Sequence, residues 1–277
     1  MIPIRIKQYP VFIKQMLKRY VVSRRPEPAN KVFHLCFFSC QSYFSYLYCS
    51  VHSLINLNTD VDFKFLIFND DEQPLSEEQI AIIKEMTPDC QVILWPKSMG
   101  WGEEQISCIW RAYKKTAKGL FEDDYIVRVD SDVFFINDFI FQLVVKSNAD
   151  LVGDGHYVDF KYSQGGCYFF KVSAVEKITT QFDVEPIRKI LGEIDIKVED
   201  LAAHHFAKRL GLKVWLTWFM MFPDELKKGY GLTAWQRKKF SCIHFVMKNK
   251  KTMLVAYEKN MVKSDAVEEF RRVTRIK

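Results

Sequence analysis

Hydrophobic residues of this chain gather in short, nearly unbroken runs that are separated by amphipathic segments. The first runs predict strands buried on both faces, at residues 31–39, 62–69 and 91–95. Amphipathic periodicity predicts helices at residues 43–57, 76–86 and 103–119. Ser76 and Gln79 form a capping-box pattern at the start of the second helix. Strands and helices that alternate in this way predict a parallel sheet with right-handed crossovers.

The second half of the chain continues the alternation. Further strands are expected at residues 125–129, 150–153, 165–171 and 213–216, and further helices at 137–147, 173–182, 185–192 and 199–210. The whole pattern predicts an α/β fold with a Rossmann-like, mostly parallel central sheet flanked by helices. We expect this domain at residues 31–250, after a basic amphipathic segment at 1–30 and before a small extension, a basic helical tail at 251–277.

Composition agrees with a folded domain, and charge separates its ends from its body. The 277 residues are 48% hydrophobic and 15% aromatic, which suffices for a sizeable core and excludes a disordered chain. Of the net charge of +6, residues 1–30 carry +6 and residues 246–277 carry +5, which leaves −5 for the body. Basic ends fit contact with an anionic membrane surface, although charged ends also keep a protein in solution.

The seven cysteines lie mostly within apolar runs and include no Cys-x-x-Cys pair, which predicts buried free thiols in a reducing compartment. The chain has no Asn-x-Ser/Thr acceptor and no signal-peptide core. No apolar stretch reaches the roughly 20 residues that a membrane-spanning helix needs. We therefore expect a cytoplasmic protein that contacts a membrane only peripherally.

The tripeptide Asp130-Ser131-Asp132 follows the apolar run 125–129. Ionised carboxylates are costly at the tip of a buried strand unless something cationic offsets them, and a divalent metal is the usual partner. Side chains two residues apart in a strand point the same way, so both carboxylates can reach one metal. Ligands collect at the carboxyl ends of parallel strands. Three other polar side chains are expected at that edge: Ser39, Cys40 and Asp70.

Three elements follow the tripeptide along the chain: the segment 165–169 (GGCYF), the acidic pair Glu199-Asp200 and the late His244. With the strand at 31–39 and the Asp-x-Asp motif, they make residues 31–250 resemble the GT-A glycosyltransferases, enzymes that use nucleotide-sugar donors. The resemblance implies a divalent cofactor, Mn²⁺ or Mg²⁺, which neutralises charge on the leaving nucleoside diphosphate.

The resemblance also implies a role for each residue of the motif. Asp132 is then the direct metal ligand, and Asp130 contacts the nucleotide ribose or holds the metal through water, with Ser131 between them in the donor site. His244 is then a further metal ligand, because imidazole coordinates Mn²⁺ acceptably. A lone histidine in an apolar strand also serves as a packing residue, so both interpretations of His244 stay open.

By the same resemblance, a carboxylate at the start of the helix 199–210 is the general base, with Asp200 preferred to Glu199. It takes the proton from the acceptor hydroxyl as that oxygen attacks the anomeric carbon, which implies one-step inversion. Acidic residues are also favoured at a helix N-terminus by the helix dipole alone.

Four further residues are candidates for donor binding. Gly165 and Gly166 allow the backbone to approach a ligand closely, or simply form a turn. Asp154 is expected to contact the donor sugar. Arg111 offsets diphosphate charge or lies on a solvated helix face.

The sequence thus predicts transfer of a hexose or deoxyhexose from a nucleoside-diphosphate-sugar to a hydroxyl of a glycan or glycolipid, with inversion and without a nucleic-acid partner. A retaining enzyme and a catalytically silent sugar- or nucleotide-binding scaffold remain alternatives. The His-x-Gly-x-x-Lys-Pro-Trp pattern of retaining glycogenin-like enzymes is missing after His244. Two other enzyme classes are disfavoured. Haloacid-dehalogenase-type phosphatases carry Asp-x-Asp near the N-terminus, whereas here it stands at residue 130. Nucleotidyltransferases need a Gly-rich loop, which residues 31–39 lack.

Overall fold

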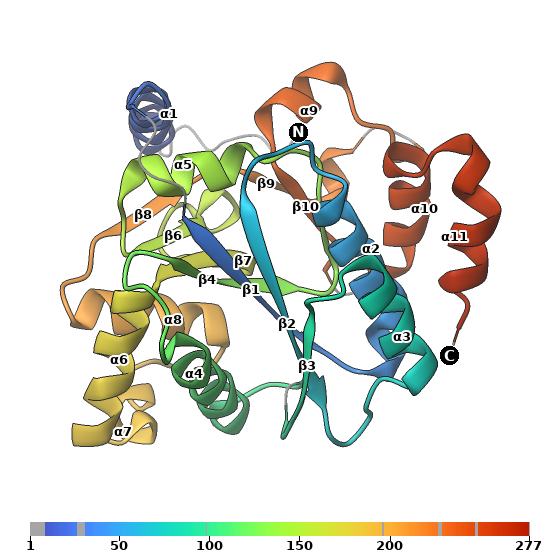
Figure 1. Cartoon of the computed structure of the whole chain (residues 1–277). Coiled ribbons are helices and arrows are strands. Elements are labelled where there is room, and N and C mark those ends of the chain that lie inside the picture. The colour runs from blue at the N-terminus through green and yellow to red at the C-terminus, as the bar shows by residue number, and fades with distance from the viewer. Residues whose placement is uncertain are drawn as a thin grey trace.

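A seven-stranded sheet forms the centre of the molecule (Figure 1). The computed structural model describes residues 9–26, 31–97, 99–195, 197–226, 229–246 and 249–276. The strands of the sheet are β1 (Val32–Ser39), β2 (Asp62–Asp70), β3 (Gln91–Trp95), β4 (Tyr125–Asp130), β6 (Leu151–Asp154), β7 (Gln164–Lys171) and β8 (Val214–Thr217). Their order is β3-β2-β1-β4-β7-β6-β8, and only β7 runs antiparallel to its neighbours. The predicted α/β class with a mostly parallel sheet is confirmed.

Helices cover both faces of this sheet. They are α1 (Tyr9–Ser23), α2 (Phe44–Ile55), α3 (Glu77–Met86), α4 (Glu103–Ala117), α5 (Phe139–Ser147), α6 (Val172–Val184), α7 (Ile187–Leu191), α8 (Glu199–Arg209), α9 (Ala234–Lys239), α10 (Lys250–Met261) and α11 (Val267–Val273). Short 3₁₀ turns lie at η2 (Gln41–Tyr43), η3 (His156–Val158), η4 (Pro223–Glu225) and η6 (Ser264–Ala266).

Alternating side chains of β4 point into two separate cores. Tyr125 and Val127 belong to a core shared with α2, α5 and α10, whereas Ile126 belongs to a core shared with α4, α6 and α8. Arg128 and Asp130 follow the same alternation as Ile126. The polar end of β4 therefore emerges on the sheet face that α4 and α8 cover.

A second, three-stranded sheet brings a distant part of the chain to the end of β4. It consists of β5 (Val133–Phe135), β10 (Cys242–His244) and β9 (Met220–Met221), in the order β5-β10-β9. In the antiparallel pair of β5 and β10, His244 stands opposite Val133. The backbone amide of Phe245 also donates to the carbonyl of Asp132 at 2.8 Å. This small sheet fixes His244 beside the aspartate motif.

The two ends of the chain pack on the same face of the sheet but far apart, with α1 at the edge that β8 forms (Figure 1). α1 lies against α5 and β8. α10 and α11, drawn in red, lie beside α2, and their side chains Met253, Tyr257 and Phe270 join the larger core. Residues 1–8 and 27–30 of the basic N-terminal segment lie outside the described residues. Among the helices that the structure describes, none has both the length and the apolar character needed to cross a membrane.

Candidate metal and donor site

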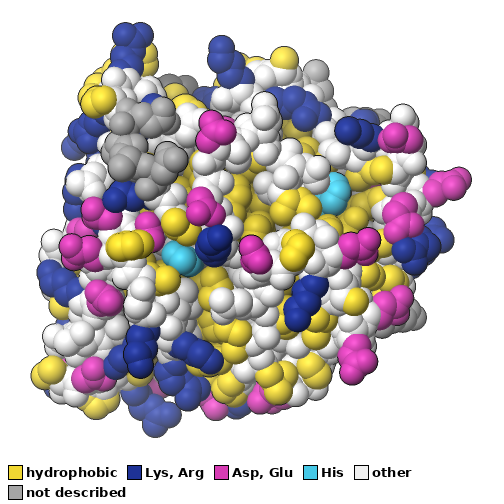
Figure 2. Space-filling model, in the orientation of Figure 1, with side chains coloured by type: hydrophobic (Ala, Val, Ile, Leu, Met, Phe, Trp, Pro, Cys, Tyr) yellow, Lys and Arg dark blue, Asp and Glu magenta, His cyan; other side chains and the backbone are white. Residues whose placement is uncertain are grey.

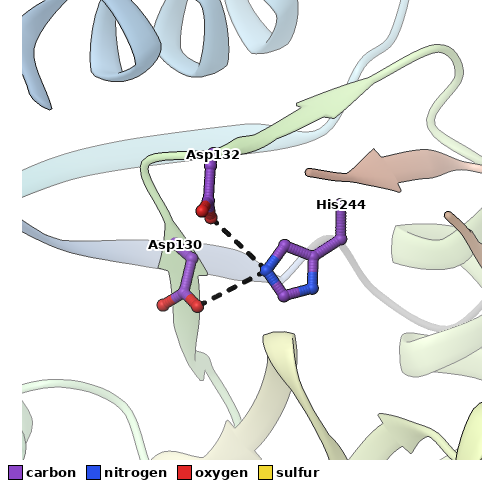
Figure 3. Close-up of side chains that lie close together, drawn as sticks. All are labelled: Asp130, Asp132 and His244. Atoms are coloured by element: carbon purple, nitrogen blue, oxygen red, sulfur yellow. Dashed lines mark ion pairs between the residues drawn. The ribbon is translucent and has the colours of Figure 1, made fainter. Parts of the chain in front are cut away.

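Asp130, Asp132 and His244 converge at the carboxyl end of β4 (Figure 3). One ligand atom from each lies within 4.8 Å of the others. The Nε2 atom of His244 is 3.3 Å from Oδ1 of Asp132 and 3.8 Å from Oδ2 of Asp130. Asp132 and His244 are buried, whereas the Asp130 side chain is partly exposed. The three residues that the sequence proposed as metal ligands thus form one cluster with an open side.

The charges within this cluster stabilise one another. Burial alone would raise the pKa of Asp132, but the hydrogen bond and charge of His244, together with the charge of Lys250, lower it below its ordinary value. Burial alone would lower the pKa of His244, yet the two aspartates raise it. A proton on the imidazole and a divalent ion therefore compete for the same pair of carboxylates.

Lys250 is a second cation at the cluster. Its Nζ lies 2.9 Å from Oδ2 of Asp132 and donates to the hydroxyl of Tyr43 at 2.7 Å. The side chain comes from the first turn of α10, while Tyr43 closes the turn η2 that follows β1. Burial alone would lower the pKa of Lys250, but Asp132 and Tyr43 raise it. Lys250 is therefore a charged group at the edge of the cluster.

Arg128 binds Asp130 from the same face of β4, two residues earlier in the strand. Its Nε and Nη2 atoms donate to Oδ1 of Asp130 at 2.9 and 2.7 Å. Its Nη1 atom lies 3.5 Å from Oε2 of Glu199 at the start of α8. Burial alone would lower the pKa of Arg128, but the charges of Asp130 and Glu199 raise it well above its ordinary value. One buried guanidinium therefore joins two of the predicted site residues.

Glu199 is part of this buried network. Its Oε1 atom accepts a hydrogen bond from the Tyr168 hydroxyl, which lies 3.0 Å from the Tyr113 hydroxyl. Burial raises the pKa of Glu199 to about 8, although Arg128 opposes the shift. These contacts suit a positioning role for Glu199 better than the role of a base.

Asp200 lies next to the glycine pair at the start of β7. Its Oδ2 atom accepts the Gly165 amide at 2.9 Å, and its Oδ1 atom accepts the Leu201 amide at 2.8 Å. Burial raises the pKa of Asp200, with these two amides opposing the shift. A Cβ atom built on Gly166 would lie 2.4 Å from Nδ1 of His244. The glycines therefore let β7 pass between the start of α8 and His244.

The other residues expected at the carboxyl edge lie there, but outside the cluster. Ser39 is the last residue of β1, and the Ser131 hydroxyl donates to the carbonyl of Phe38 in β1 at 3.4 Å. The Cys40 sulfur lies beside a serine hydroxyl of η2. Asp70, at the end of β2, accepts three backbone amides, including that of Met99 at 3.0 Å. A contact of these residues with the nucleotide stays a prediction.

Two expected donor contacts lie away from the cluster. Asp154 has no exposed surface, and it accepts the backbone amides of His156, Phe219 and Met220 at 2.8–3.0 Å. A carboxylate that three amides hold in the interior fixes the chain around it and is closed to a donor. Arg111 is exposed on α4 and directs its guanidinium to the Cys108 sulfur at 2.8 Å. The buried position of Asp154 contradicts its expected sugar contact, whereas a contact of Arg111 with the diphosphate stays a prediction.

Sequence reasoning missed Arg128 and Lys250, the two cations that contact the aspartates. Arg128 did carry a signal, because it is the charged residue of an apolar strand and stands two positions before Asp130, on the same face. Lys250 carried no such signal, since only the folded chain brings α10 to the end of β4.

No protein-family model matches the chain, and no curated protein matches it. Its fold is similar to solved structures of glycosyltransferases. The apo structure of the bifunctional glycosyltransferase WbbM matches with a TM-score of 0.56 and 11% identity, over 90% of this chain and 52% of that one. GlyE of Streptococcus pneumoniae TIGR4 matches with a TM-score of 0.49 and 11% identity, over 89% of this chain and 64% of that one.

An active-site mutant of LgtC matches with a TM-score of 0.48 and 10% identity, over 87% of this chain and 94% of that one. The present chain thus spans about half the length of the WbbM structure. At such low identity the similarity to WbbM establishes the fold, which is that of a glycosyltransferase structure, as the Asp-x-Asp resemblance implied.

Proposed function

We propose that this protein is a divalent-metal-dependent glycosyltransferase that moves a hexose or deoxyhexose from a nucleoside-diphosphate-sugar to an acceptor hydroxyl. The observation that carries the proposal is the convergence of Asp130, Asp132 and His244 within 4.8 Å at the carboxyl end of a strand. In open α/β sheets this edge is where ligands bind. The shared fold with WbbM, whose structure is titled a bifunctional glycosyltransferase, supports the same class.

The donor set fits a divalent ion. Two carboxylates and one imidazole offer oxygen and nitrogen ligands, which suit Mn²⁺, while Mg²⁺ prefers oxygen alone. Asp132 and His244 would hold the ion, with Asp130 as a direct or water-mediated ligand. When bound, such an ion neutralises charge that develops on the leaving diphosphate. Lys250, beside Asp132, is suited to pair with a phosphate oxygen of the donor.

Asp200 is the residue we propose as general base. Two backbone amides fix the orientation of its carboxyl group, and burial raises its pKa toward the range in which a carboxylate accepts a proton efficiently. Arg128 then orients Asp130 and neutralises charge beneath the site. Such a base would serve inversion, in which the acceptor oxygen displaces the nucleoside diphosphate in one step.

The proposal also covers the acceptor and the location. We propose a glycan or glycolipid acceptor and a cytoplasmic protein that contacts a membrane at its periphery. The buried, free state of all seven cysteines supports a reducing compartment.

Calorimetry with nucleoside diphosphates, in Mn²⁺ and in chelator, tests the donor site. We expect binding at least about tenfold tighter with Mn²⁺, and loss of that gain in Asp132→Asn. The matched control Asp183→Asn changes an exposed aspartate of α6 that pairs with Lys114 of α4, and it should bind normally. Nucleotide binding that ignores the metal and the Asp132 substitution would refute the proposal.

Hydrolysis of a panel of nucleoside-diphosphate-sugars then identifies the donor. The anomer released first, observed by NMR, reports inversion or retention. Asp200→Asn should keep nucleotide affinity and lose roughly 10²-fold or more in turnover. Turnover close to that of the native protein, with donor binding intact, would exclude Asp200 as the base.

A further inference from the structure

The helix α1 is held to the body by one side of its surface. Arg19 is only 6% exposed, and its guanidinium donates to the backbone carbonyls of Trp218 and Lys239. The Phe12 ring packs edge-on against the Trp218 ring, with centroids 5.2 Å apart, and Val22 is buried. A buried arginine with two carbonyl partners is costly to detach, so α1 is a fixed part of the molecule.

The opposite side of α1 exposes large apolar side chains. Ile13 is 51% exposed, Leu17 61%, Tyr20 54% and Val21 58%. Positions 13, 17, 20 and 21 recur at helical spacing, so the four side chains form one stripe, which we call the outer stripe of α1. Soluble proteins rarely leave contiguous apolar surface of this kind without a partner.

Positive charge borders the outer stripe. Lys14, Lys18, Arg24 and Arg25 are all exposed, and residues 9–26 contain no acidic residue. Burial and the nearby charges of Lys213, Lys14 and Arg25 lower the pKa of Lys18, so the positive patch extends onto the start of β8. Figure 2 shows hydrophobic and basic side chains next to each other at the upper left, where α1 lies in Figure 1.

The basic C-terminal helices differ from α1 in this respect. Arg271 pairs with Glu258 through two hydrogen bonds of 2.9 and 2.6 Å, and Arg272 pairs with Glu269 in the same way. Their apolar side chains Phe270 and Val273 face the core. Basic charge at that end is therefore partly neutralised and lacks an apolar stripe.

We infer that the outer stripe of α1 docks this protein on an anionic lipid bilayer. The apolar side chains would enter the interface between headgroups and acyl chains while the flanking lysines and arginines contact lipid phosphates, which is how interfacial amphipathic helices bind. A second copy of the chain is a poorer occupant of the outer stripe. It would bring the lysines and arginines beside one stripe against those beside the other.

Contacts lead from α1 to the metal cluster. The Trp218 ring that holds Phe12 stacks on His156 at 4.0 Å, and the neighbouring Tyr157 packs on Phe222, whose ring lies 5.7 Å from that of His244. A bilayer bound at α1 would thus lie near the edge of the sheet that carries the site. This favours a lipid-linked acceptor over a free glycan, a consequence that rests on the proposed function, whereas the docking itself does not.

Co-sedimentation with phosphatidylglycerol–phosphatidylcholine vesicles tests the inference on the full chain. We expect binding that weakens with salt and is at least about tenfold stronger than to pure phosphatidylcholine vesicles. The double variant Ile13→Glu, Leu17→Glu should bind at least about tenfold more weakly. The matched control Val184→Glu, Val255→Glu alters two exposed aliphatic residues of other helices, 80% and 56% exposed, by the same charge and should bind as the native chain does.

Three results would overturn the inference: no sedimentation with anionic vesicles, equal binding to both kinds of vesicle, or an equal loss in the control variant. Analytical ultracentrifugation that shows a dimer, abolished by the α1 variant alone, would assign the stripe to a second copy instead. Thermal unfolding checks that both variants fold. Metal-dependent nucleotide binding, measured in solution on the same variants, should be unchanged, so failure of the docking and failure of the proposed function are separate results.

Discussion

Replacing Gly166 by alanine tests how His244, the proposed metal ligand, is placed. Gly166 has a φ of +101°, which L-residues rarely adopt, and a Cβ atom there would lie 2.4 Å from Nδ1 and 2.7 Å from Cε1 of His244. Ordinary contact begins near 3.4 Å, so the imidazole would have to retreat by about 1 Å. Because ligand distances in metal sites tolerate only about 0.2 Å, such a shift should damage metal binding as well as stability.

Gly119→Ala is the control that separates the backbone cost of the substitution from the cost of the clash with His244. Its φ is +83°, and nothing lies within 4 Å of a Cβ atom built there. Gly119→Ala should therefore lose only the backbone term, about 1–3 kcal/mol. Gly166→Ala should lose a similar backbone term and a further ~1–3 kcal/mol from overpacking against His244.

Urea denaturation measures the stability difference, and titration with Mn²⁺, followed by the EPR signal of the free ion, measures metal affinity. We expect Gly166→Ala to bind Mn²⁺ about 10–100-fold more weakly and Gly119→Ala to bind it normally. In the His244→Ala background, Gly166→Ala should cost only the backbone term, because the clashing ring is gone. Equal destabilisation by Gly119→Ala and Gly166→Ala, or an equal cost of Gly166→Ala with and without His244, would refute the proposed packing of Gly166 against His244.

Three further predictions concern charges. Arg128→Met should destabilise by about 3–5 kcal/mol in urea, and adding Glu199→Gln should recover part of it; strictly additive losses would contradict a shared guanidinium. Lys250→Met removes a cation that competes with the metal for Asp132 and that is proposed to pair with a donor phosphate. In calorimetry it should bind Mn²⁺ alone about tenfold more tightly and nucleoside diphosphate about tenfold more weakly. Changes of the same sign in the two affinities would contradict this double role of Lys250. Burial raises the pKa of Asp154 from 3.8 to about 7, so the free energy of unfolding should fall between pH 4 and 7 by up to about 4 kcal/mol, because the folded state keeps the proton longer. Asp154→Asn should flatten this pH dependence of stability in urea denaturation. An unchanged pH dependence would show that other groups cause it.

Local patterns predicted the parts of the fold that local forces determine. The strand at 91–95 has the expected bounds, and the capping box of Ser76 and Gln79 forms with both hydrogen bonds. Long apolar runs and caps express preferences of neighbouring residues, so they survive in any tertiary context. The strand β5 escaped prediction, because three residues carry no period and its pairing with β10 is set by a segment far along the chain.

The site divides in the same way. Parallel strands share a carboxyl edge, so the meeting of Ser39, Asp70 and Asp130 follows from strand order alone. Whether a side chain at that edge faces a ligand or the interior depends on the loops. Asp154 ends β6 at the same edge, yet it is buried: the amides of Phe219 and Met220, in the chain after β8, donate to it, as does the amide of His156. Sequence position could not distinguish Asp154 from Asp130, because two of these amides come from a segment far along the chain.

The carboxylates of the Asp-x-Asp motif have charge partners within the protein. Two carboxylates at a buried strand tip require cations, and the protein itself supplies two: Arg128 contacts Asp130, and Lys250 contacts Asp132. The cost of burying the aspartates is therefore met without any metal, and their presence alone does not imply one. The proposed metal site depends instead on His244, whose Nε2 atom lies within 3.8 Å of both carboxylates and whose ring fits there because Gly166 has no Cβ atom. A divalent ion can replace the proton on an imidazole that lies between two carboxylates, because all three groups are then metal ligands. A lysine or an arginine keeps its protons and is not such a ligand.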